Sequence, residues 1–204
     1  MKFAHVRFSF AVLAAYVTRG RNDLPDPRAM VLEPVDVPPG WKRKSDRTFR
    51  TGLMSPDAPW AERLRHARGT SYIIAYRDPN DPWALIVSQA FPFVNAADAM
   101  AAFPLMEDRL LTNPDMSVVE TRRSPVELVT APGDEYRALS IESTKLGEWG
   151  SQGVQLLVLW RHGSVIGFLT VSGRTGRYTV GDLEALATCQ DQRIVEALAR
   201  PKLA

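Results

Sequence analysis

Few residues in this 204-residue chain have types and spacing that could carry chemistry. The loop Gly173-Arg-Thr-Gly176-Arg177 places Arg174 and Arg177 among glycines, just before Thr179, which can cap a helix. Guanidinium groups beside a helix N-terminus can hold an anion. An anionic ligand is therefore expected in this loop if the chain binds one. The plainer interpretation is a flexible loop with solvated arginines.

Two further residues complete the predicted binding site. Trp149 lies in Lys145-Leu-Gly-Glu-Trp-Gly150, whose glycines indicate a loop. An exposed tryptophan is typical of binding hot spots, although this one could equally fold over a sheet. Arg161 stands just before the expected turn at 162–164. Trp149, Arg161, Arg174 and Arg177 are thus the predicted contacts for a partner or small ligand.

The usual signatures of catalysis and metal binding are missing from the sequence. No G-x-S-x-G nucleophile motif is present, and the single cysteine, Cys189, falls in the middle of an expected helix. His66 and His162 form no paired zinc-ligand motif. We therefore predict no catalytic residue, metal or cofactor. The alternative is a small enzyme of unknown reaction that uses a pocket histidine as a base.

Charge excludes one class of partner and singles out one cluster. The chain has 25 basic and 23 acidic residues. One dense basic cluster, Lys42-Arg-Lys44 with Arg47 and Arg50, lacks the interleaved aromatic residues that stack on bases. Nucleic acid is therefore not expected as a partner. The cluster suits an acidic partner or anionic lipid head groups, or it is simply solvated charge.

The first residues indicate export. Residues 1–18 combine a basic start with a short apolar run, which is typical of a secretory signal peptide and too short to span a membrane. Tyr16 stands where a lipoprotein signal would have its lipid-carrying cysteine. Residues 19–40 are rich in proline and predict a tether, or alternatively a loop wrapped on the domain. Residues 41–204 then form one domain.

These segments predict a periplasmic or cell-surface protein that lies near a membrane through its N-terminus. The alternative is a cytoplasmic protein whose first segment is structural.

Strand-like and helix-like blocks alternate along the domain. A hairpin is expected at 71–77 and 83–91, with Asp78 to Pro82 as its turn. Strands are expected at 116–121, 135–144, 154–161 and 165–172, and helices at 59–67, 97–111 and 180–200, with Pro104 ending or kinking the second helix. This order predicts an α+β fold with a single antiparallel sheet covered by helices.

Two blocks of the chain resemble each other. Residues 69–111 and 153–195 align at a constant offset that pairs Tyr76-Arg77 with Trp160-Arg161 and Asn95 with Thr179. Each block reads as two strands followed by a helix. The sheet is thus expected to hold two ββα half-repeats, and a duplicated ferredoxin-like fold is the alternative.

The order of elements is similar to that of the PsbP/Mog1-like fold. The residues that carry the resemblance are Pro38-Pro39-Gly40-Trp41 after the export-like start, Tyr76-Arg77, and the stretch from Leu159 to Val171 with its final helix. Proteins that look similar include many exported bacterial proteins and lipoproteins and act as accessory and binding modules. The resemblance therefore implies a non-enzymatic exported envelope protein that binds a partner or small ligand.

Overall fold

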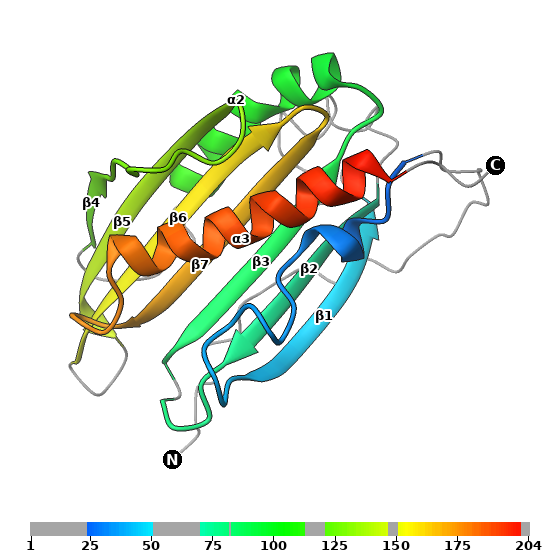
Figure 1. Cartoon of the computed structure of the whole chain (residues 1–204). Helices are drawn as coiled ribbons and strands as arrows, with labels where there is room; N and C mark the ends of the chain where they lie inside the picture. Colours follow the sequence, from blue (N-terminus) through cyan, green and yellow to red (C-terminus); the bar gives the residue numbers. More distant parts are fainter. Residues whose placement is uncertain (1–23, 51–69, 82, 113–120, 147–150, 201–204) are drawn as a thin grey trace.

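The computed structural model describes residues 24–50, 70–81, 83–112, 121–146 and 151–200. These residues form one antiparallel sheet of seven strands with an α helix on each face, so the α+β class with a single antiparallel sheet is confirmed (Figure 1). The elements are η1 (Pro27–Met30), β1 (Lys42–Arg50), β2 (Thr70–Arg77), β3 (Leu85–Pro92), α2 (Ala96–Thr112), β4 (Thr121–Pro125), β5 (Glu135–Leu146), β6 (Ser151–His162), β7 (Val165–Arg174) and α3 (Val180–Ala199).

The strand order across the sheet is β1-β2-β3-β7-β6-β5-β4. The β2–β3 and β6–β7 hairpins therefore lie side by side in the middle, joined by the β3–β7 pairing. The helices that follow them cover opposite faces of the sheet. Two half-repeats of the same ββα unit are not confirmed by this arrangement.

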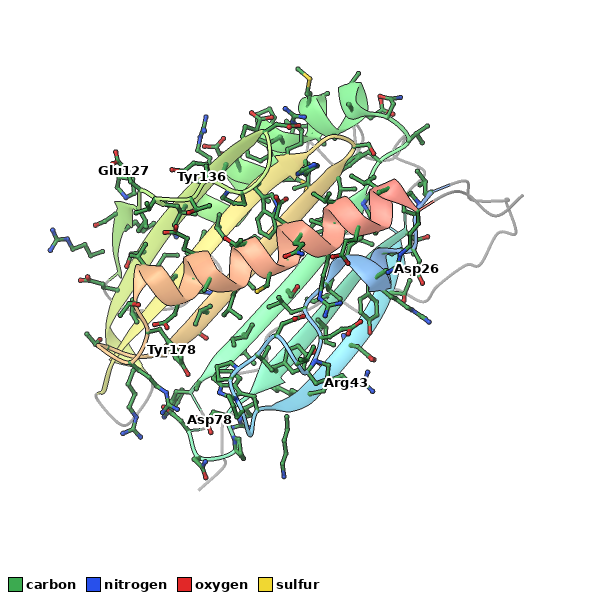
Figure 2. The ribbon with its side chains drawn as sticks, viewed as in Figure 1. Asp26, Arg43, Asp78, Glu127, Tyr136 and Tyr178 are labelled. Carbon is green, nitrogen blue, oxygen red and sulfur yellow. The ribbon has the colours of Figure 1, made fainter. Side chains whose placement is uncertain are left out.

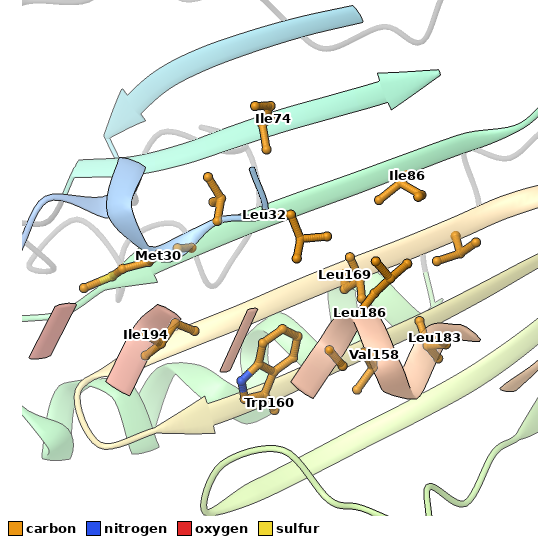
Figure 3. Packing of buried hydrophobic residues seen from close by; sticks show 14 of the residues in the cluster. Met30, Leu32, Ile74, Ile86, Val158, Trp160, Leu169, Leu183, Leu186 and Ile194 are labelled. Atoms are coloured by element: carbon orange, nitrogen blue, oxygen red, sulfur yellow. The ribbon is translucent and has the colours of Figure 1, made fainter. Parts of the chain in front are cut away.

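Each face of the sheet has its own apolar core. The face covered by η1 and α3, called the front face below, buries Trp160, Leu169 and Leu183 among others (Figure 3). The other face, called the back face, packs Phe91, Phe168 and Leu159 against α2. Because consecutive residues of a strand point to opposite faces, β6 and β7 supply both cores from alternate positions.

The front helix begins where the sequence predicts. Thr179 accepts a hydrogen bond from the backbone nitrogen of Asp182, and the carboxylate of Asp182 accepts one from the backbone nitrogen of Thr179. This capping box satisfies backbone donors that the first turn leaves free. The helix then buries a stripe at helical spacing, comprising Leu183, Leu186, Ala187, Gln190, Ile194 and Ala197.

Part of the predicted tether is built into the domain. Met30, Val31, Leu32 and Val37 are buried in the front core. The hydroxyl of Tyr76 donates to the carbonyl of Leu32 at 2.9 Å. Arg193 of α3 forms ion pairs with Glu33 and Asp36 at 3.1 and 2.6 Å. The segment consists of the short helix η1, which begins at Pro27, and the turns that follow it, and its apolar residues are covered by the sheet and α3.

Several boundaries differ from the sequence expectations. The basic cluster at 42–50 forms the strand β1, which was not expected. Of the strand expected at 116–121, only Thr121 is among the described residues, and there it begins β4. Pro104 lies inside α2 without ending the helix. The expected helix at 59–67 and the signal-like residues 1–18 lie outside the described residues. Among the described helices, none is long and apolar enough to cross a membrane.

Candidate functional site

Arg177 joins two loops at one end of the sheet. It follows β7, and its guanidinium donates to Asp78 and, at 2.9 Å, to Asp81, both in the β2–β3 turn. Both carboxylates are buried, with 7% and 3% of their residue surfaces exposed. Their other oxygens accept from backbone nitrogens of the turn, Asn80 at 2.8 Å and Trp83 at 3.0 Å. The turn that the composition predicts is confirmed, and Arg177 neutralises the charges of its two carboxylates.

An aromatic side chain packs beside this ion pair. The Arg177 guanidinium lies 5.6 Å from the ring centre of Tyr178, and its Nε donates to the Tyr178 hydroxyl. The ring covers Gly173, where an added Cβ would lie 2.5 Å from a ring carbon. Burial raises the pKa of Tyr178. Figure 2 shows Tyr178 and Asp78 at the same end of the sheet.

Arg161 makes a similar connection at the opposite end of β7. Its side chain is 12% exposed and donates to Glu135 at 2.6 Å and to Asp134 at 2.7 Å. Asp134 also accepts from the backbone nitrogen of Gly163, so the pair fixes the β6–β7 turn. The ten residues of β7 separate Arg161 from Arg177 by about 30 Å.

The structure therefore places Arg174 and Arg177 together and separates Arg161 from them by the length of β7. Arg161 and Arg177 have carboxylate partners inside the chain and lie at opposite ends of β7. Arg174 is exposed at the end of β7, where its carbonyl accepts from the backbone nitrogen of Arg177. Trp149 lies outside the described residues. Binding of an outside anion at the 173–177 loop stays a prediction, and the ligand would have to compete with Asp78 and Asp81.

His162 lies beside a carboxylate that sequence reasoning did not connect to it. Its Nδ1 is 3.2 Å from Oδ1 of Asp191 on α3, an approach that falls short of hydrogen-bond geometry. Asp191 Oδ1 accepts from the indole nitrogen of Trp160 at 2.9 Å, and its Oδ2 accepts from Gly133. A carboxylate beside an imidazole is an arrangement that can orient a general base.

A hollow of about 260 Å³ opens on the front face, between the start of η1 and the adjoining ends of β1 and β2. It is lined by Leu24, Pro25, Asp26, Pro27, Arg28, Thr48 and Thr70. Its cation, Arg28, is exposed and lies 5.7 Å from the ring centre of Tyr72. Among the described residues that line this hollow, none is a histidine.

Among the described residues, the basic cluster forms one edge of the sheet. β1 is the terminal strand, and residues 42–48 are all exposed. Its pairing with β2 is interrupted between Arg43 and Ser45 and then runs without a break from Ser45 to Arg50. Sequence reasoning found this cluster but missed the strand, because its charged residues give no apolar alternation.

The cations of β1 are distributed over both faces. Thr48 pairs with Tyr72, which belongs to the front core, so Thr48 points to the front. Arg47 pairs with the next residue, Ile73, and therefore points to the back. Arg43 is on the front face, where it forms an ion pair with Asp46 at 3.0 Å. Figure 2 labels Arg43 on this outer strand and Asp26 near η1.

No family model matches the chain, and no curated protein matches it significantly. Among the described residues, no group of three or more histidine, cysteine, aspartate or glutamate side chains is placed to hold a metal ion.

Proposed function

We propose that this chain is a non-enzymatic exported protein of the cell envelope that binds an acidic macromolecular partner along β1. The observation that carries the proposal is the exposed terminal strand, with four cations and one carboxylate between Lys42 and Arg47. Such a cationic edge attracts an acidic surface from a distance and orients it before contact.

Three other arginines support this choice, because each is already paired with carboxylates of the chain. Arg161, Arg177 and Arg193 each neutralise two carboxylates within the chain. Their guanidinium groups therefore stabilise loops and the front helix. On β1, the described ion pair is the one between Arg43 and Asp46, which leaves Lys42, Lys44 and Arg47 available for a partner.

The export part of the proposal rests on the signal-like residues 1–18 and on the resemblance of the order of elements to the PsbP/Mog1-like fold, for which we also propose two ββα half-repeats. The charge balance is compatible with cleavage of a signal peptide. Removing the first fifteen residues takes away Lys2 and Arg7 and leaves 23 basic and 23 acidic residues. The remaining charge then resides in local clusters such as β1.

Two measurements test this function. The mass of the mature protein from native cells should show a chain that begins after the apolar run, whereas a full-length cytoplasmic chain would contradict export.

For binding, a photoreactive residue replaces Ser45 on β1 or, as a control, Arg122 on the opposite edge strand β4. One discrete adduct from position 45, lost in an Arg47→Glu background, is the expected result. Equal adducts from both positions would contradict the proposal.

A second candidate function is a small enzyme that uses His162 as a base. The contact of His162 with Asp191 is the observation that favours it. If it is correct, His162→Gln abolishes a hydrolytic activity against a panel of ester and amide substrates and leaves the thermal unfolding midpoint unchanged. Wild-type protein with no activity above that of His162→Gln would contradict it.

A further inference from the structure

We propose that the partner contributes an extended acidic segment, which adds as a strand to the outer edge of β1 and carries two consecutive acidic residues. This inference rests on the proposed function and specifies how β1 is used. It names the Ser45–Arg50 edge as the backbone template, and Arg28 and Arg47 as the two cations that select the segment.

The backbone of β1 provides the first part of the site. In an antiparallel ladder, every second residue of an edge strand directs its N–H and C=O away from the neighbouring strand. Within the described residues, β2 is the one strand that pairs with β1. The uninterrupted register from Ser45 to Arg50 spans six residues, which is an ordinary strand length. A peptide strand can therefore form regular hydrogen bonds with this edge.

The two faces of β1 provide the second part. On the back face, Arg47 is exposed beside Ile73. On the front face, the neighbouring residue Thr48 lines the hollow that also contains Arg28 and Thr70. Neighbouring side chains of an added strand point to opposite faces. One acidic side chain thus reaches Arg47 while the next enters the hollow beside Arg28 and the threonine hydroxyls.

One carboxylate inside the hollow opposes this binding. Asp26 accepts from the backbone nitrogen of Arg28 at 3.0 Å and caps η1. Asparagine caps a helix about as well as aspartate, so Asp26→Asn keeps η1 and removes the repulsion. Asp26→Asn should therefore strengthen binding of the acidic segment, and Arg28→Ala should weaken it.

The charges also argue against a second copy of the chain as the occupant. Pairing β1 with itself would place Lys42, Lys44 and Arg47 of both copies close together, and β4, at the other edge, carries Arg122. Like charges directly opposite each other destabilise a strand pair. Basic residues on an edge also prevent such self-pairing, which is compatible with recognition of an acidic strand.

The test uses the full chain and a fluorescein-labelled eight-residue peptide, with an Asp-Glu pair between valine and threonine residues. Fluorescence anisotropy should show binding of this peptide and none of an Asn-Gln version. Two further peptides carry N-methyl groups at alternate backbone positions, one set odd and one even. If the peptide adds as a strand, one set abolishes binding and the other leaves the affinity within about twofold.

Substitutions then locate the contacts. Arg28→Ala and Arg47→Ala should each weaken binding by about fivefold, the upper range for an exposed ion pair, and Asp26→Asn should strengthen it. Arg122→Ala on β4 is the matched control and should leave the affinity unchanged. Circular dichroism of each variant confirms that the sheet is retained.

Three results would overturn the inference. Equal binding of both N-methylated sets would show attraction by charge alone. Failure of the peptide to bind, while the adduct from position 45 still forms in cells, would leave the proposed function standing without strand addition. Binding to phosphatidylglycerol vesicles through Arg28 and Arg47, with no peptide binding, would assign the surface to lipid. Loss of the adduct from position 45 would instead remove the proposed function itself.

Discussion

The indole nitrogen of Trp160 donates a hydrogen bond of 2.9 Å to the carboxylate of Asp191. The tryptophan is fully buried in the front core, and Asp191 reaches it from α3. The same carboxylate accepts from Gly133, so one side chain links a central strand, the front helix and the loop before β5. This contact explains how a large indole fits an apolar core without an unpaired donor.

We expect Asp191→Ala to lower the free energy of unfolding by about 2 kcal/mol, because it leaves the buried indole donor and the Gly133 nitrogen unpaired. Urea unfolding followed by tryptophan fluorescence measures the change. Cys189→Ser, at an exposed position on the same helix, is the control and should stay within about 0.5 kcal/mol of the wild type. An Asp191→Ala variant as stable as that control would contradict this role.

A glycine on β7 makes room for the same indole. A Cβ added at Gly167 would lie 2.4 Å from carbons of the Trp160 ring. Gly167→Ala should therefore cost about 2 to 3 kcal/mol of unfolding free energy, because a fully buried ring has no space into which to move. Gly181→Ala, where the nearest atom to an added Cβ is 3.6 Å away, should be neutral or stabilising because alanine favours the helix. The thermal unfolding midpoints of both variants, measured against that of the wild type, test this difference.

Arg177 is expected to matter for stability whether or not it binds a ligand. Arg177→Ala leaves two buried carboxylates without their cation, so urea unfolding should show a lower stability than that of the wild type. Because Arg177 is itself 38% exposed, solvent screening reduces this loss. Adding Asp78→Asn and Asp81→Asn should recover part of the loss by removing the buried charges. If the triple variant is less stable than Arg177→Ala alone, the carboxylates have another role.

Alkaline pH should destabilise the fold through Tyr76. Burial raises the pKa of Tyr76 to about 12, with a further contribution from Asp36, whereas an unfolded tyrosine titrates near 10. The folded state holds the proton more tightly, so stability is unaffected below pH 10. It then falls between about pH 10 and 12, by roughly 2 to 3 kcal/mol when complete.

Tyr76→Phe separates this effect from other alkaline transitions, since burial also raises the pKa of Tyr72 and Tyr178. Urea unfolding at pH 9 and pH 11 should show a smaller difference for the variant than for the wild type. The variant should also be about 1 kcal/mol less stable at pH 9, because it loses the hydrogen bond to Leu32. An unchanged pH dependence would contradict the assignment to Tyr76.

The parts of the fold that follow local rules could be predicted from the sequence. The capping box of Thr179 and the apolar stripe of α3 are local patterns, and the hairpins around Asp78 and His162 depend on turn residues that lie between β-branched runs. The strand β1 could not be found in this way, since an exposed edge has no buried face to impose alternation.

The candidate site was harder to predict because its contacts join distant parts of the chain. Arg177 and Asp78 are 99 residues apart, and Arg193 and Asp36 are 157 residues apart. Residue types identified Arg177 as a cation near a helix, but no local signal shows that buried carboxylates from another turn already neutralise it. The pairing of His162 with Asp191 likewise depends on how α3 lies across the sheet.

The packing of η1 against α3 has a consequence for synthesis of the chain. Met30 and Leu32 near its start share a core with Leu183 and Ile194 near its end. In a nascent chain whose α3 is still inside the ribosome, η1 can pack against β2 and β3, but this core stays open on the side that α3 later covers.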